Sequence, residues 1–159
     1  MQDLPYDYIL YTDGSGYEKD GFSGWCCQVV SNVPGVEGQR RMGCMSGSTV
    51  DRAEFTALLE GLEMILDLDR NTPSLGPRRP KVLWYSDRES LVGGVTRIWG
   101  PDKGRNSSPD LWARFAHYEP RFLLKGVHVA RETDFKEFQD CDLHSSSLRI
   151  VLKDYVESL

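Results

Sequence analysis

Residues 11–16 of this chain read YTDGSG and follow the largely apolar residues Tyr8, Ile9 and Leu10. A short apolar run bounded by turn-forming residues is typical of a strand. The sequence therefore predicts a strand over residues 8–12 that ends at Asp13. An acid followed by glycines at a strand end fits a metal-ligating carboxylate, a nucleotide phosphate loop or a calcium loop, and the rest of the chain must decide among these sites.

Strands and helices alternate along the remainder of the sequence. Two further strands are expected over residues 24–30 and 41–46, and short connections make the first three strands antiparallel. Apolar residues recur with a 3.6-residue period from Ala53 to Leu66, which predicts a helix. The following segments are expected to be a loop over 71–80, a strand over 81–86, a helix over 90–99, a polar segment over 100–109, a short helix over 110–118, a strand over 122–130 and a helix over 141–158.

Length and composition describe an ordinary globular protein. A chain of 159 residues, 40% of them apolar, suits one core, so we expect a single domain over residues 1–159. The formal net charge of −5 argues mildly against broad phosphate neutralisation. No basic leader followed by an apolar segment and no run of 18 apolar residues is present, so we expect a cytoplasmic protein that does not enter a membrane. The four cysteines lack zinc-ligand spacing and are expected to be reduced thiols.

Four acids fall where strands end or where helices face the sheet. Asp13 ends the first predicted strand and Asp87 follows the fourth. At 100° per residue, Glu54 borders the apolar stripe of the first long helix, whereas Glu60 points away and should be solvated. Asp142 flanks the corresponding stripe of the last helix. Taken singly, each acid has an ordinary role in a turn, at a helix start or on a solvated surface.

Together, the four acids would repel one another strongly unless a cation lay among them. Carboxylates without a histidine or cysteine partner suit a hard divalent ion such as Mg²⁺. Two such ions, about 3.5–4 Å apart, can hold the attacking water and the leaving oxygen of a phosphodiester in line. The pattern therefore favours a phosphodiesterase site.

The ordered segments TDGSG, STVDRAEFTALLEGL, VLWYSDRESLVGGV and CDLHSSSLR resemble the ribonuclease H family, type 1 branch, over residues 6–156. The resemblance implies an α/β, ribonuclease H-like fold: a five-stranded mixed sheet, its first three strands antiparallel, flanked by helices. It also implies an endoribonuclease that hydrolyses the RNA strand of RNA/DNA hybrids, leaving 5′-phosphate ends, with two Mg²⁺ or Mn²⁺ ions. The metal-binding and catalytic acids would be Asp13, Glu54, Asp87 and Asp142.

The two rival explanations of the opening stretch fail. Sugar-kinase and actin-like ATPases use a similar acid-glycine phosphate loop, but they need two such domains and this chain is too short. A calcium loop requires an acid or amide where Tyr17 stands and glycine where Glu18 stands. In the surviving interpretation, Gly14, Ser15 and Gly16 keep the backbone open beside a substrate phosphate and sugar.

The chain departs from the family pattern in its loops. The family commonly carries a Gly-His segment before the last acid, and here Glu132 falls near the histidine's place, either as a replacement proton carrier or as a loop residue without a role. Arg88, which follows Asp87, would reach a phosphate or offset the acids. Thr49 and Arg52 occupy the turn that in the family contacts the minor groove, and Asp51 stands where an amide is often found.

These departures leave two classes of function open. The first is a metal-dependent ribonuclease H that binds hybrids weakly, in a salt-sensitive manner, as a monomer or with help from a larger replication or repair complex. The second is a non-catalytic nucleic-acid-binding or interaction module of the same fold, with a nuclease for junction DNA or double-stranded RNA as a related variant. The persistence of all four acids favours the enzyme, and the absent histidine and thin basic surface favour the module.

Overall fold

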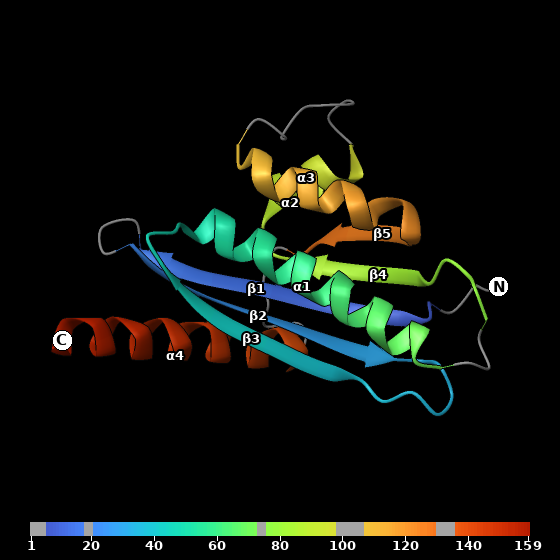
Figure 1. The fold of residues 1–159 in the computed structure, drawn as a ribbon, viewed down its shortest axis with the longest axis horizontal. Coiled ribbons are helices and arrows are strands. Elements are labelled where there is room, and N and C mark those ends of the chain that lie inside the picture. Colours follow the sequence, from blue (N-terminus) through green and yellow to red (C-terminus); the bar gives the residue numbers. More distant parts are fainter. Residues whose placement is uncertain (1–5, 18–20, 73–75, 98–106, 130–135) are drawn as a thin grey trace.

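The protein is built on one five-stranded mixed sheet with strand order β3-β2-β1-β4-β5, as Figure 1 shows. The computed structural model describes residues 6–17, 21–72, 76–97, 107–129 and 136–159. The predicted sheet is confirmed, with antiparallel pairing among the first three strands and parallel pairing of β1 with β4 and of β4 with β5. The strands are β1 (Tyr8–Tyr17), β2 (Phe22–Ser31), β3 (Gln39–Ser46), β4 (Lys81–Ser86) and β5 (Leu123–His128).

The helices cover both faces of this sheet. Gly14 of β1 lies against one of them and Gly24 of β2 against another. Because Gly24 pairs with Ser15, the neighbour of Gly14, alternation along the strands directs these two glycines to opposite faces. The helices are α1 (Val50–Arg70), α2 (Glu89–Thr96), α3 (Pro109–Tyr118) and α4 (Lys136–Ser158), with the short 3-10 turn η2 (Glu119–Arg121) after α3. Within the described residues, no helix is both long enough and apolar enough to span a bilayer.

The main core lies between the sheet and the layer formed by α1, α2 and α3. Its fully buried members include Leu10 from β1, Leu58 and Leu62 from α1, and Phe115 from α3. Trp84 of β4 is also fully buried, and its indole N–H donates to the Thr12 hydroxyl at 2.8 Å. The apolar stripe predicted for α1 therefore packs on the sheet as expected.

The opposite face is covered in part by α4, which packs very closely on the middle strands. A Cβ added at Gly24 would lie 1.9 Å from the carbonyl oxygen of Ser145 in α4. Nearby, the buried thiol of Cys141 lies 3.8 Å from the carbonyl oxygen of Tyr11. The position of α4 over β1 and β2 thus depends on glycine at position 24.

The first strand is longer than its sequence predicts. The prediction ended it at Asp13, but β1 continues to Tyr17 because residues 13–17 still pair with β2. Only the parallel pairing with β4 stops earlier, at Tyr11 opposite Tyr85. The glycines that suggested a strand end are held in extended geometry by the hairpin partner, so the prediction that Asp13 ends the strand is wrong.

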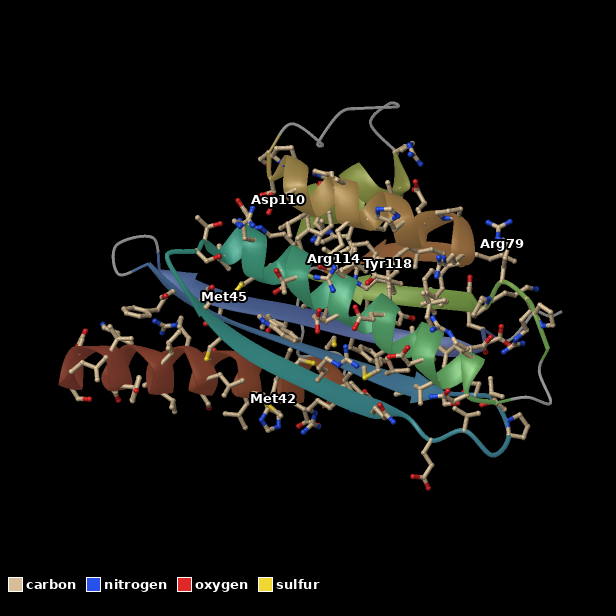
Figure 2. All side chains as sticks on the ribbon, viewed as in Figure 1. Met42, Met45, Arg79, Asp110, Arg114 and Tyr118 are labelled. Carbon is tan, nitrogen blue, oxygen red and sulfur yellow. The ribbon has the colours of Figure 1, made fainter. Side chains whose placement is uncertain are left out.

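The expectation that Glu60 is solvated is also wrong. Its carboxylate accepts from Arg114 of α3 at 2.7 Å and from Arg41 of β3 at 3.3 Å. Tyr118 donates to the neighbouring Glu63 at 2.9 Å, and Figure 2 shows Arg114 and Tyr118 beside α1. The outer side of α1 is polar because it meets an arginine network.

We predict that Gly24→Ala destabilises the protein by about 1–3 kcal/mol, the usual range for overpacking, because its Cβ would collide with the α4 backbone. Gly16→Ala in the same hairpin is the comparison variant and should cost less, since its nearest contacts would be 3.3 Å away, which is tight but not a collision. Chemical denaturation of both variants measures the difference. Equal stability of the two variants would mean that α4 does not press on β2 at this point.

Candidate active site

The site begins where β1 and β4 part. Their last paired residues are Tyr11 and Tyr85, and beyond them β1 continues alongside β2 only. Asp13 lies two residues past its strand's last pair, and Asp87 lies two residues past the corresponding pair. Because the two strands are parallel and in register up to that point, these two acids emerge at equivalent positions.

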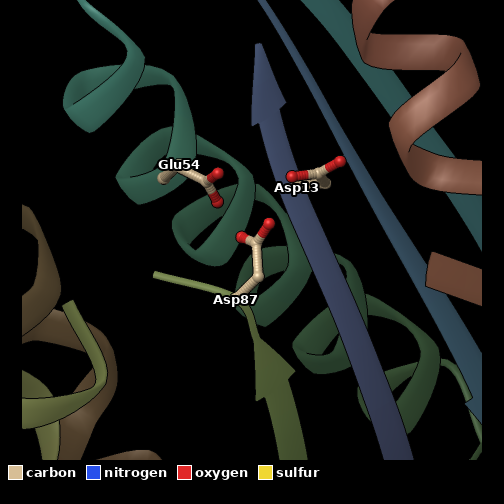
Figure 3. Close-up of side chains that lie close together, drawn as sticks. All are labelled: Asp13, Glu54 and Asp87. Carbon is tan, nitrogen blue, oxygen red and sulfur yellow. The ribbon is translucent and has the colours of Figure 1, made fainter. Parts of the chain in front are cut away.

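The third acid is brought in by close packing of α1 on β1. A Cβ at Gly14 would lie only 2.7 Å from the backbone nitrogen of Glu54, so glycine permits this approach. One carboxylate oxygen from each of Asp13, Glu54 and Asp87 lies within 4.8 Å of the others. Figure 3 shows these three side chains, from β1, α1 and the end of β4, close together.

Burial makes this cluster electrostatically unfavourable without a cation. Asp13 and Glu54 are only 2% and 3% exposed. Burial, then the charges of Asp13 and Asp87, raises the pKa of the Glu54 carboxyl well above its ordinary value. The backbone N–H of Gly14 donates to Asp13 Oδ1 at 2.9 Å, whereas buried Glu54 Oε2 accepts no hydrogen bond from the described residues.

These features fit a divalent metal ion. The donors are carboxylate oxygens alone, which suit Mg²⁺ or Mn²⁺ better than softer metals. Glu54 Oε2, which has no hydrogen-bond partner among the described residues, is a carboxylate oxygen that could ligate such an ion. A cation among the three carboxylates would relieve both their mutual repulsion and this unmet acceptor.

For the two other predicted catalytic acids, Asp142 and Glu132, the structure describes no side chain. The backbone of Asp142 belongs to α4, between Cys141, which contacts β1 at Tyr11, and Ser146, whose hydroxyl lies 3.3 Å from that of Ser15. This register puts position 142 alongside β1 near Asp13, but the Asp142 side chain lies outside the described part of the structure. Glu132 lies outside the described residues altogether, so both roles stay predictions.

The residues predicted to hold substrate have clear structural partners. Gly14 makes room for α1, and a Cβ at Gly16 would crowd β2 and the start of α1. The Ser15 hydroxyl lies 3.3 Å from the Arg149 side chain of α4. Thr49 is the N-cap of α1 and accepts from the backbone N–H of Arg52 at 3.2 Å. The sequence prediction assigned these residues to substrate alone and missed their packing and capping roles.

Both predicted substrate-binding arginines are held in ion pairs. Arg52 donates to both carboxylate oxygens of Asp110 in α3, at 3.0 and 2.7 Å. Arg88 pairs with Asp51 of α1. These partners are 58 and 37 residues away in sequence, so no local pattern indicates them.

A pocket of 310 Å³ opens beside the acid cluster. It is lined by residues at the N-terminal ends of α1, α2 and α3, including Asp51, Phe55, Arg88 and Trp112. The Phe55 and Trp112 rings meet edge to face with centroids 4.5 Å apart. An aromatic and charged hollow next to clustered acids is suited to a nucleic-acid strand.

Comparison with known proteins agrees with this architecture. No family model matches the chain. The chain is 25% identical to the ribonuclease H of Neorickettsia sennetsu, over 77% of this chain and 82% of that protein. Its structure matches LC11-RNase H1, crystallised with an RNA/DNA hybrid, with TM-score 0.66, 20% identity and coverage of 91% and 98% of the two chains. RNase H1 from Halobacterium salinarum gives TM-score 0.64, 20% identity and coverage of 89% and 96%.

The sheet topology and the superposed structures define a ribonuclease H-like fold, as the sequence predicted. Three acids lie on β1, on α1 and at the end of β4, in the order that the sequence comparison led us to expect, and the chain is similar to a curated ribonuclease H. The type 1 branch inferred from the sequence is also the branch named for these solved neighbours.

We predict that Glu54→Gln stabilises the protein in chelator, and increasingly so as the pH rises. A raised folded-state pKa means that the native protein keeps a proton which the unfolded chain releases above about 4.5. The wild type therefore loses stability, relative to the variant, from that pH up through the folded-state pKa. Each kcal/mol of difference would shift Tm by about 2–4 °C.

Thermal unfolding of both proteins, from about pH 5 to about pH 8 in chelator, measures this difference. Adding Mg²⁺ or Mn²⁺ should then raise the Tm of the wild type more than that of Glu54→Gln. A pH-independent difference between the two proteins would contradict the crowded arrangement of the carboxylates.

Proposed function

We propose that this protein is a metal-dependent endoribonuclease that hydrolyses the RNA strand of RNA/DNA hybrids. The observation that carries the proposal is the convergence of Asp13, Glu54 and Asp87, whose carboxylate oxygens lie within 4.8 Å of one another at the open end of β4. Similarity to a ribonuclease H, and to an RNase H1 crystallised with an RNA/DNA hybrid, supports this activity and this substrate.

Two Mg²⁺ or Mn²⁺ ions are the proposed cofactors. Asp13, Glu54 and Asp87 would hold them, and Asp142 would complete the set from α4. When bound, such ions lower the pKa of water and neutralise the charge that develops on the phosphodiester. The protein supplies rigid placement: β1 fixes Asp13, and the Gly14 N–H orients its carboxylate.

Substrate would enter along the starts of α1 and α2. Thr49, Asp51 and Arg52 lie at the start of α1, one turn before Glu54, and Arg88 directly follows Asp87. A phosphate that approaches the acids from this side would pass these residues. Contacts with 2′-hydroxyls in the minor groove would let this surface distinguish the RNA strand from DNA.

A non-catalytic module of the same fold is the second candidate. The observation that favours it is the ion pairing of both Arg52 and Arg88, which leaves this surface with little free positive charge. A nuclease for junction DNA or double-stranded RNA is the related variant. The enzyme remains the preferred proposal because a binding module has no need for three crowded, largely buried acids.

We further propose that the protein is cytoplasmic and monomeric, and that it meets hybrids with the help of a larger replication or repair complex. The weak positive charge around the acid cluster supports the last point, since phosphate neutralisation dominates unassisted affinity.

We predict cleavage of only the RNA strand when the purified protein meets an end-labelled RNA/DNA hybrid with Mg²⁺ or Mn²⁺. Double-stranded RNA, double-stranded DNA and branched DNA serve as competing substrates. Chelator and the variants Asp13→Asn and Asp87→Asn should each abolish cleavage, because each removes an ion or its ligands. Gel analysis of the labelled strands provides the measurement.

Asp154→Asn is the matched control, since it neutralises an exposed aspartate of α4 and should leave the rate unchanged. An intact hybrid with either metal, given a folded protein that binds nucleic acid, would favour the non-catalytic module. Cleavage of branched DNA or of double-stranded RNA instead would leave the fold assignment unchanged and show that the proposed substrate is wrong.

A further inference from the structure

Two ion pairs flank the acid cluster, and in both of them the acid is the more exposed partner. The Asp51 side chain is 63% exposed and that of Arg88 37%. Similarly, the Asp110 side chain is 62% exposed and that of Arg52 36%. Both carboxylates are therefore open to solvent beside the guanidinium groups that they pair with.

Both acids also lie where helices attract anions. Asp51 is in the first turn of α1, and Asp110 is in the first turn of α3. Helix starts favour negative charge and are common phosphate sites. The protein's own carboxylates thus occupy positions that substrate phosphates would otherwise take, and Arg52 holds the pKa of Asp110 down at about 2, so this acid stays charged.

The Asp51–Arg88 pair is next to two members of the acid cluster along the chain. Asp51 is three residues before Glu54 on α1, and Arg88 follows Asp87. Both side chains line the 310 Å³ pocket, together with the hydroxyl-bearing Ser90 and Ser108. A backbone phosphate entering this pocket must compete with Asp51 for the Arg88 guanidinium.

We infer that Asp51 and Asp110 act as internal competitors for substrate phosphates, and that these two interhelix ion pairs set the affinity and the salt dependence of hybrid binding. The inference rests on the proposed function and deepens it. Arginine pairs with phosphate and with carboxylate through similar charge-assisted, frequently bidentate hydrogen bonds, so exchange is feasible when a hybrid arrives. Exposed ion pairs are weak enough to open.

Removing one competitor tests the inference. Asp51→Asn should bind an RNA/DNA hybrid about two- to fivefold more tightly than the wild type at about 0.1 M salt, the change expected from releasing one exposed ion pair. The plot of log affinity against log salt should become steeper, by at most about one unit, because Arg88 contacts a phosphate more fully once Asp51 no longer competes for it. Fluorescence anisotropy with a labelled hybrid in chelator gives both values.

Glu119→Gln is the matched control, since it removes the same charge and breaks the Arg97–Glu119 pair, away from the acid cluster. Its affinity should change much less than that of Asp51→Asn. In the double variant Asp51→Asn/Arg88→Gln, the gain should disappear, because the freed guanidinium is its cause. Thermal unfolding checks that each variant is folded.

Provided that the wild type binds or cuts hybrid, three outcomes would overturn this inference and leave the proposed function standing. These are equal affinities for Asp51→Asn and Glu119→Gln, an unchanged salt slope, and a gain that persists without Arg88. If binding in chelator is too weak to measure, the KM for hybrid cleavage with Mg²⁺ replaces it and should fall two- to fivefold, about the same factor. A wild type that neither binds nor cuts hybrid would refute the proposed function itself.

Discussion

The crowding of three carboxylates at one end of the sheet is the constraint on which the account of this protein depends. Asp13 and Glu54 are buried beside Asp87, and their charges oppose one another in a poorly solvated space. Side chains placed in this way destabilise a fold unless a cation or a proton compensates. A divalent ion among the three carboxylates, as proposed above, would supply this compensation.

The geometry that creates this crowding comes from the backbone rather than from the acids. β1 stays paired with β2 after it has parted from β4. Beyond Tyr11, this leaves an opening on the side of β1 that β4 had occupied. Gly14 lets α1 approach the opening on one face, and Gly24 lets α4 approach on the other. Asp13 on β1 and Glu54 on α1 are held more firmly than acids carried by loops, and Asp87 directly follows the last residue of β4.

Much of the fold could be predicted from sequence because its signals are local. The strand Lys81–Ser86 matches its predicted bounds, and the apolar period of α1 fixed both the helix and the side on which Glu54 lies. The extension of β1 could not be predicted, because glycines in a hairpin strand look like a turn until the partner strand is known. The ion pairs of Glu60 with Arg41 and Arg114 depend on contacts between distant elements, which the periodicity of a sequence does not reveal.

The candidate site likewise combines features that the sequence predicted with features that only the structure shows. The order and residue type of the acids predicted Asp13, Glu54 and Asp87, and the structure brings these three together, while their catalytic role stays a prediction. The pairing of Arg52 and Arg88 with acids of neighbouring helices was not predictable, since each pair joins segments that only the folded chain brings together. Sequence therefore indicated the chemistry of the site, and structure added the electrostatic state of the surface around it.

Diffraction from crystals grown with Mn²⁺, recorded at the manganese absorption edge, would test the central claim most directly. The account predicts an anomalous peak in contact with the carboxylates of Asp13, Glu54 and Asp87, and it would also show whether Asp142 of α4 joins them. Manganese bound only elsewhere on the protein, with the three acids linked to one another by shared protons, would contradict it.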